Sequence, residues 1–194
     1  MKRSVVALAV AFQIATTAAF AESSKKYDPG ASDAEIKLGQ TMPYSGPASA
    51  LSGVGKGQVA YFKYLNETQG GVNGRKINLL SLDDGYSPPK TVELTRQLVE
   101  RDKVFAIVNT IGTATNRTTH RYLNQKKVPQ FFILSGAAQW NDPKNYPWTM
   151  MGMVAYQTEG AVYARNILTT TPNARIALLR PNDASGKDYV EGFK

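Results

Sequence analysis

Two threonines and a glycine that follow an apolar run are the residues whose spacing best indicates chemistry. The segment 104–115 reads VFAIVNTIGTAT, with Gly112, Thr113 and Thr115 near its end. Its uncharged start is typical of a strand buried on both faces. If a helix begins after Gly112, its first backbone N–H groups have no intrahelical partner and attract an anionic group. An ordinary turn with a threonine N-cap is the alternative interpretation.

The composition excludes several other chemistries. The chain has no cysteine, so disulfides, thiolate metal sites and cysteine nucleophiles are excluded. Its single histidine, His120, excludes a metal centre with several histidine ligands. His120 lies in the polar stretch THRYLNQ, where we expect it on a solvated helix face. We therefore predict no catalytic residue, no metal site and no cofactor.

Two further groups resemble catalytic motifs without matching them. Asp83 and Asp84 are adjacent at the end of a predicted strand, where neighbouring side chains point to opposite faces and do not pair. We expect them to cap the following turn. Ser45 and Ser135 stand beside glycine, but neither has the G-x-S-x-G arrangement of a nucleophile elbow. The sequence therefore lacks the nucleophile elbow that an α/β hydrolase requires.

The N-terminus has the pattern of a secretory signal peptide at 1–21. Lys2 and Arg3 precede a mostly apolar stretch, and Ala-Phe-Ala at 19–21 is a small-residue cleavage site. We expect cleavage after Ala21 and a periplasmic location, with a buried N-terminal helix as the alternative. No run in the chain reaches the roughly 18 apolar residues of a membrane-spanning helix.

The formal net charge is +8, and removal of Lys2 and Arg3 with the signal takes away two positive charges and leaves +6. The basic residues are spread along the chain and lack the clusters and aromatic platforms of a nucleic-acid interface. We therefore expect no nucleic-acid partner. A solvated positive surface helps to attract anionic ligands.

Apolar strands alternate with helices along most of the chain, which predicts an α/β fold with a doubly wound parallel sheet. The expected strands are 35–42, 75–82, 104–108, 128–134, 147–151 and 174–179. The expected helices are 50–68, 89–102, one that ends near 126, 155–170 and one that begins at 187. Ligands of such sheets bind beyond the carboxyl ends of the strands. The four loops there, PYSGP, DDGYSPP, NTIGTAT and SGAAQW, all combine glycine with hydroxyl groups.

Five segments in order suggest a family: EIKLGQTMPYSGP, LNETQGGVNGRKINLLSLDDGYSP, LVERDKVFAIVNTIGTATN, KKVPQFFILSGA and ARIALLRPNDASGKDYVEGFK. Together they resemble the substrate-binding proteins of branched-chain amino acid type ABC transporters, which have the type I periplasmic-binding fold. The resemblance covers essentially the whole mature chain, but only about half of the usual two-lobed body. We therefore expect a chain truncated after its first lobe, with a leader at 22–33, a first ligand-binding lobe at 34–150 and an incomplete second lobe at 151–194.

The resemblance implies a function and a set of site residues. Family members hold a small ligand between two hinged lobes and deliver it to a membrane permease. In amino-acid-binding relatives, the loops that match 111–115 and 135–137 hold the ligand's carboxylate and ammonium groups. On this basis we expect a monomer whose ligand-binding residues are Tyr44, Ser45, Tyr86, Ile111, Gly112, Thr113, Thr115, Ser135, Gly136, Tyr156 and Gln157.

The identity of the ligand stays open between two classes. Ala137 stands where amino-acid-binding relatives have a threonine, which weakens an ammonium site. The segments DDGYSPP, GTATN, WNDP and PWTM look closer to the branch that takes aromatic or other organic carboxylates. The expected ligand is therefore a branched-chain or other amino acid, or an aromatic or organic acid. An extracellular ligand-sensing domain of a receptor and a non-functional fragment are the alternative functions.

Overall fold

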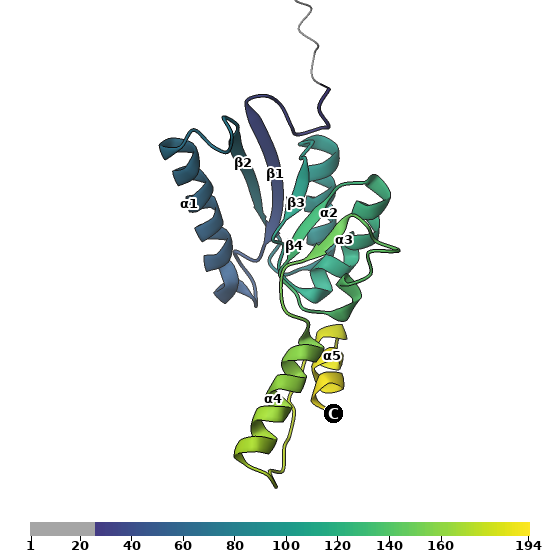
Figure 1. The fold of residues 1–194 in the computed structure, drawn as a ribbon. Coiled ribbons are helices and arrows are strands. Elements are labelled where there is room, and N and C mark those ends of the chain that lie inside the picture. Colours follow the sequence, from purple (N-terminus) through teal and green to yellow (C-terminus); the bar gives the residue numbers. More distant parts are fainter. Residues whose placement is uncertain (1–25) are drawn as a thin grey trace, which may run out of the picture.

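A parallel sheet of five strands forms the body of the protein in the computed structural model, which describes residues 26–194 (Figure 1). The strand order is β2-β1-β3-β4-β5, and every neighbouring pair is parallel. The strands are β1 (Glu35–Met42), β2 (Lys76–Asp83), β3 (Ala106–Val108), β4 (Gln130–Ile133) and β5 (Thr149–Met151). The predicted α/β class with a parallel sheet is confirmed. The predicted signal peptide lies outside the described residues.

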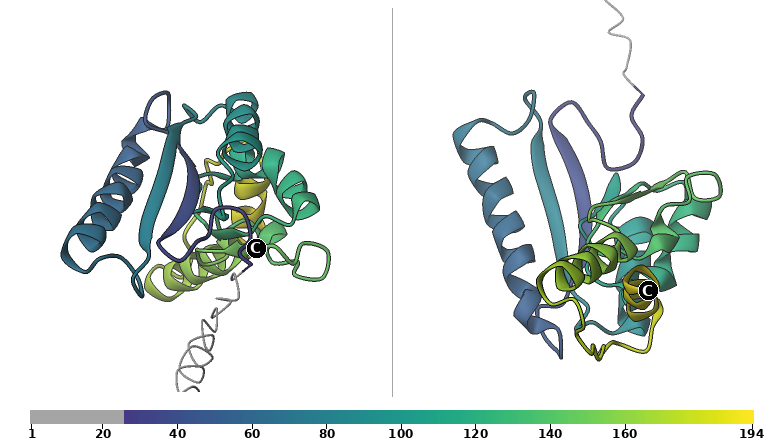
Figure 2. Two further views of the ribbon diagram at one scale, coloured as in Figure 1. Left: turned by 90° about the horizontal axis from the view of Figure 1, so that it is seen from above. Right: turned by 60° about the horizontal axis from the view of Figure 1, so that its bottom comes forward.

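Helices connect the strands and cover the sheet, as Figure 2 shows from two further directions. They are α1 (Ser52–Thr68), α2 (Pro88–Arg96), α3 (Thr113–Lys126), α4 (Tyr156–Thr170) and α5 (Ala184–Phe193). The helix predicted at 89–102 has an irregular end, because α2 passes into a π-helical turn, η2 (Gln97–Arg101). A short 3-10 turn, η3 (Ala138–Trp140), follows β4.

The direction of winding reverses between β1 and β3. The chain passes from β1 to its neighbour β2 on one side, and later from β3 to β4 on the other side. The loops that leave the carboxyl ends of β1 and β3 therefore diverge from a common point. In open α/β sheets this switch point is where ligands bind. The topology thus directs attention to the loop after β3, which contains Gly112 and Thr113.

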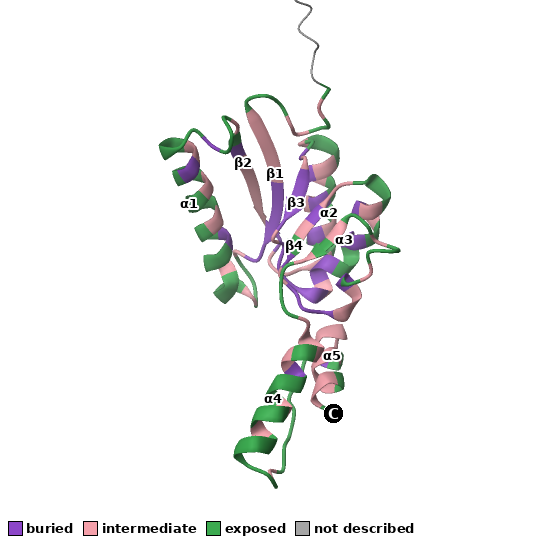
Figure 3. Cartoon of the chain, in the orientation of Figure 1, coloured by how far each residue is buried: buried purple, intermediate pink, exposed green. Residues whose placement is uncertain are grey.

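Buried residues concentrate on the central strands of the sheet and on α3 (Figure 3), and some of the buried apolar side chains form two clusters. The first packs Leu98 of η2 and Leu123 of α3 against Val104 and Ile107. The second joins Ile133, Ala137 and Trp140, and the partly buried Met151 and Tyr156 pack against it. The second cluster therefore lies where the end of β4, strand β5 and the start of α4 meet.

Helices α4 and α5 pack against each other and project beyond the carboxyl edge of the sheet (Figure 1). The strand predicted at 174–179 is wrong, because this segment has no regular structure and Leu179 is fully exposed. No strand of the described residues lies beside it to complete its backbone hydrogen bonds. Helix α5 begins at Ala184, ahead of the predicted 187, because the Asp183 side chain caps it by accepting from the Gly186 N–H.

His120 is buried, which contradicts the expectation of a solvated helix face. Its side chain is 8% exposed, its ring centroid lies 4.0 Å from that of Tyr146, and its ring meets that of Trp140 edge-on at 5.0 Å. Nε2 has no hydrogen-bond partner among the described residues. Burial lowers the pKa of His120 below its ordinary value, and the nearby Asp142 opposes this shift.

We expect the protein to lose stability as the pH falls from about 7.5 to about 5.5. The unfolded chain gains a proton at His120 near pH 6.5, whereas burial lowers the pKa in the folded chain. The unfolded state therefore binds more protons in this window, so stability is full above the unfolded pKa and falls as the pH approaches the folded pKa. Urea unfolding at the two pH values measures the loss.

His120→Gln is the matched control, because the sequence has one histidine and this variant removes its titration. We expect the free energy of unfolding of His120→Gln to change less between the two pH values. An equal change in the parent chain and the variant would contradict the assignment to His120.

Candidate functional site

The loop between β3 and α3 is held by the side chain of Asn116, which is almost fully buried. Its Nδ2 donates to the backbone oxygens of Gly112 at 2.6 Å and Thr110 at 3.2 Å. Its Oδ1 accepts from the Thr110 hydroxyl and from Gln130 Nε2 at 2.9 Å. With both ends of its amide satisfied, Asn116 fixes the path of the chain into α3. Sequence analysis missed this residue.

Gly112 is the N-cap of α3, and no side chain caps the helix there. The alternative of a threonine N-cap is therefore wrong. The φ of Gly112 is 102°, and a Cβ atom at this position would lie 2.4 Å from Tyr86 Cε2. Glycine is thus required for both conformation and space. The N–H groups at the first turn of α3 have no partner within the helix, so they present a partial positive charge at the switch point.

Thr113 and Ser135 form a pair of buried hydroxyl groups beside this helix start. Their Oγ1 and Oγ atoms lie 2.7 Å apart, although the residues come from different loops. Ser135 Oγ also accepts from the indole Nε1–H of Trp140 at 2.9 Å. Thr113 is 4% exposed, Ser135 is 0% exposed and Trp140 is 3% exposed. The structure therefore brings together the two loops for which the sequence predicted a shared site.

The other predicted residues of these loops serve mainly to shape the backbone. The Thr115 hydroxyl donates to the Ile111 oxygen at 2.6 Å, and Ile111 forms an isolated parallel bridge with Leu134. The oxygen of Gly136 accepts from the backbone N–H of Tyr156 at 2.8 Å. These contacts fix the loop geometry around the Thr113–Ser135 pair.

Tyr86 lies over Gly112 and has a φ of 59°, so the loop after β2 bends sharply to place it there. Burial raises the pKa of its hydroxyl, and the Asp183 carboxylate shifts the pKa in the same direction. Tyr86 therefore stays protonated at neutral pH and can donate a hydrogen bond. Contacts between α5 and α3 place α5 near this edge of the sheet. The sequence analysis did not predict a role for Asp183. Its side chain accepts from the N–H three residues later, at Gly186, as an N-cap aspartate typically does.

Tyr156 and Gln157 connect the projecting helices to the loop after β4. The Tyr156 ring stacks on that of Tyr189, with centroids 4.7 Å apart. Gln157 Nε2 donates to Asp188 Oδ1 at 3.4 Å, and the other carboxylate oxygen of Asp188 accepts from the Ala138 N–H at 2.8 Å. Asp188 is thus a junction that the sequence did not reveal, because it depends on contacts between distant segments.

Tyr44 and Ser45 are bonded elsewhere and do not join the Thr113–Ser135 pair. The Tyr44 hydroxyl lies 2.6 Å from Ser81 Oγ. Ser45 donates from its backbone N–H and its hydroxyl to the two oxygens of Asp83, at 3.1 and 2.6 Å. The hydroxyl bond is the largest cause that lowers the pKa of Asp83.

The sequence predicted that the adjacent Asp83 and Asp84 would not pair, and the structure confirms this. Asp84 turns away from Asp83 and accepts from the Tyr86 N–H and the Thr91 hydroxyl, both at 2.9 Å. Each carboxylate therefore stabilises a turn, which confirms the expected structural role. Among residues 26–194, no group of three or more histidine, aspartate or glutamate side chains is placed to hold a metal ion.

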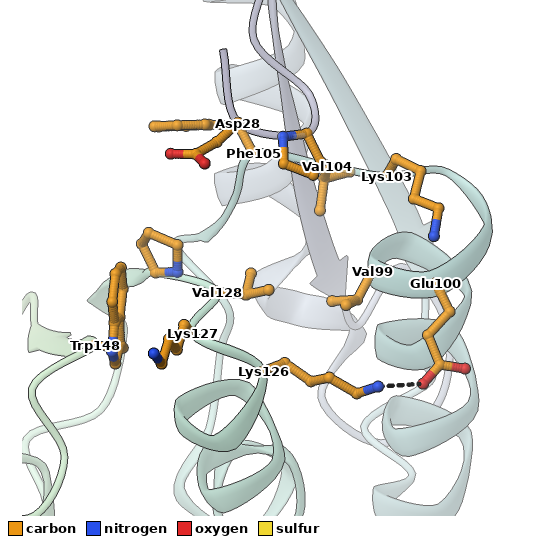
Figure 4. A pocket seen from close by; sticks show the side chains of 12 residues that line it. Asp28, Val99, Glu100, Lys103, Val104, Phe105, Lys126, Lys127, Val128 and Trp148 are labelled. Atoms are coloured by element: carbon orange, nitrogen blue, oxygen red, sulfur yellow. Dashed lines mark ion pairs between the residues drawn. The ribbon is translucent and has the colours of Figure 1, made fainter. Parts of the chain in front are cut away.

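A pocket of about 460 Å³ lies at the opposite, amino edge of the sheet (Figure 4). Apolar side chains such as Val104, Phe105 and Trp148 line it together with three lysines, and Lys126 pairs with Glu100 at 3.6 Å. These lysines lie next to the carboxyl ends of η2 and α3, where positive charge offsets the helix dipoles. The helix dipoles therefore explain the positive charge of this pocket without a ligand. No predicted site residue lines the pocket.

We expect Gly112→Ala to destabilise the protein by at least about 1 kcal/mol, because alanine disfavours positive φ and its Cβ would meet Tyr86. Gly57→Ala is the matched control. Gly57 lies within α1 with no atom near its Cβ position, so alanine should stabilise the protein by up to about 1 kcal/mol. Urea unfolding of both variants tests this, and equal stability of Gly112→Ala and the parent would contradict the geometry.

A sequence model of the family described as periplasmic binding protein matches residues 35–194. A comparison with proteins of curated function found no match. The part of the chain that the structure describes contains no helix long and apolar enough to cross a membrane.

Solved structures with the same fold include three informative neighbours. A possible leucine/isoleucine/valine-binding protein from Rhodopirellula baltica SH 1 has 25% identity, a TM-score of 0.73, and coverage of 83% of this chain and 43% of the neighbour. A substrate-binding periplasmic protein from Ralstonia solanacearum has 28% identity, a TM-score of 0.73, and coverage of 82% of this chain and 44% of the neighbour. The third is an ABC transporter solute-binding protein from Rhodopseudomonas palustris BisB5 in complex with 3,4-dihydroxy benzoic acid. It has 22% identity, a TM-score of 0.67, and coverage of 82% of this chain and 42% of the neighbour. The chain thus spans less than half the length of these proteins.

Proposed function

Because the chain belongs to the periplasmic binding protein family, we propose that it acts as an exported solute-binding protein of an ABC importer. In this proposal it captures a small carboxylate-bearing ligand in the periplasm and delivers it to a membrane permease. The family is one of binding proteins and not of enzymes, in agreement with the sequence prediction. The signal peptide predicted at 1–21 supports the proposed location.

One observation carries the carboxylate part of the proposal. The buried Thr113–Ser135 hydroxyl pair lies beside a helix start that no side chain caps. Hydroxyl and N–H donors that converge on one point favour a carboxylate, because its oxygens accept hydrogen bonds and its charge interacts well with the helix dipole. The protonated Tyr86 hydroxyl supplies a further donor at the same edge.

We propose that the lobes divide as the sequence predicted. Residues 34–150 would form the first lobe, with 147–151 as a hinge crossing and 151–194 as the beginning of the second lobe. Helices α4 and α5 support this division, because they pack on each other and project from the sheet. A ligand would then lie between the Thr113–Ser135 pair and the starts of α4 and α5, and lobe closure would retain it.

The ligand in this proposal is an amino acid, or an aromatic or other organic acid. The neighbour from Rhodopirellula baltica is described as a possible leucine/isoleucine/valine-binding protein, and that from Rhodopseudomonas palustris is in complex with an aromatic acid. Ala137 offers no hydroxyl for an ammonium group, which favours the second class. Tyr86 and Tyr156 would supply partly apolar walls for either ligand.

We expect a matching ligand to raise the thermal midpoint of the purified chain, because binding only to the folded state stabilises it. The panel is leucine, isoleucine, valine and 3,4-dihydroxybenzoate, each beside its primary amide. If an acid raises the thermal midpoint more than its amide does, the result supports a carboxylate ligand. A cooperative melt with no shift for any acid would contradict the proposed ligand class.

Thr113→Val should weaken binding of the active acid about tenfold, because it removes one charge-assisted hydrogen bond and keeps the side-chain shape. Thr118→Val is the matched control on the exposed face of the same helix. Calorimetric titration of both variants provides the measurement. Unchanged affinity in Thr113→Val, with the fold intact by circular dichroism, would count against this site.

A further inference from the structure

We propose that Trp140 is a positioning residue that sets the direction of the hydrogen bonds through Ser135 to Thr113. Trp140 donates to Ser135, and Ser135 donates to Thr113. The Thr113 hydroxyl then presents its own hydrogen to the ligand, and the site selects a carboxylate. The inference rests on the proposed function, since it concerns the same site. It adds a specificity-determining residue that does not itself touch the ligand.

The argument begins with the chemistry of the three groups. An indole N–H can only donate, whereas a hydroxyl has one hydrogen and two acceptor positions. Trp140 Nε1 donates to Ser135 Oγ at 2.9 Å, and the Ala137 N–H points at the same oxygen at 3.4 Å. Both acceptor positions of Ser135 are therefore engaged by groups that cannot accept in return.

In residues 26–194, the Thr113 hydroxyl oxygen is the one acceptor to which the Ser135 hydroxyl is hydrogen-bonded. Ser135 is fully buried, and the Thr113 hydroxyl oxygen lies 2.7 Å from its Oγ. In the opposite direction, Thr113 would donate to an oxygen that already accepts twice, and the Ser135 hydrogen would be buried without an acceptor. An unsatisfied buried donor is costly, so Trp140 favours donation from Ser135 to Thr113.

Thr113 consequently accepts from inside the protein, and its own hydrogen stays free for the ligand. In the described part of the chain, Ser135 is the one side chain to which the Thr113 hydroxyl is hydrogen-bonded. The free hydrogen lies beside the first N–H groups of α3, so the donors of this site act together. Successive hydrogen bonds polarise one another, which strengthens the last donor in the series.

The surroundings keep the Trp140 ring in place. Its side chain packs with Ile133 and Ala137, and the edge-on His120 ring lies 5.0 Å away. Its backbone N–H donates to the Ala137 oxygen at 3.1 Å within η3. The indole N–H therefore has a fixed orientation toward Ser135, as a positioning role requires.

A double-mutant cycle with Trp140→Phe and Thr113→Val tests the inference by calorimetry. The probes are 3,4-dihydroxybenzoate and leucine, each compared with its primary amide. Trp140→Phe keeps a ring but removes the N–H, so we expect about tenfold weaker binding of the acid and little change for the amide. In the Thr113→Val background, Trp140→Phe should cause no further loss. Equal losses for acid and amide, or additive losses in the cycle, would show a merely structural role and overturn the inference.

A neutron structure of the deuterated parent chain tests the direction without any variant or ligand. We expect a deuterium on Ser135 Oγ that points to Thr113 Oγ1. A deuterium on Thr113 that points to Ser135 would overturn the inference even if an acid binds. If no probe binds, the proposed function fails, and the deuterium position still decides the hydrogen-bond direction.

Discussion

The start of α3, which no side chain caps, is the feature on which the rest of the proposed site depends. A helix start needs acceptors, and a side chain usually supplies one at the N-cap. Here the N-cap is Gly112, whose positive φ and contact with Tyr86 leave no room for a side chain. The fold therefore leaves donors open at the point where its winding reverses. In the proposed function, a ligand anion is the acceptor at this place.

The helix that begins here has an unusually polar buried face. The inner face of α3 carries Thr115, Asn116 and His120, where a helix packed on a sheet normally presents aliphatic side chains. Hydrogen bonds from Asn116 and Thr115 to the loop after β3 replace part of the usual apolar packing. Such networks specify one geometry when all their members are satisfied. Among the described residues, Gln130 Oε1 in this network and Nε2 of the buried His120 have no hydrogen-bond partner. Burial lowers the pKa of His120, so acid acts against this polar interior through His120.

Local patterns revealed most of the fold, and tertiary contacts explain what they missed. The strands that became β3 and β4 were predictable because the short apolar runs VFAIV and FFIL end in turns that contain glycine. The segment 174–179 has the same kind of pattern, yet it is not a strand because it finds no neighbouring strand among the described residues. In the site, Gly112 and Thr113 follow from their position after a buried strand. Trp140 and Asp188 could not be predicted, since their roles arise from hydrogen bonds to segments that only the fold brings near.

The second core cluster connects the loop after β4 to the projecting helices. Trp140 belongs to this cluster and also bonds to Ser135, while Tyr156 packs against the cluster from the first turn of α4. A rotation of α4 about the segment before it must therefore change the packing around Trp140. Because protein interiors are close-packed, such a change reaches the hydroxyl groups that Trp140 orients. In the proposed arrangement of two lobes, the orientation of the lobes and the donor strength of the proposed site thus depend on the same few contacts.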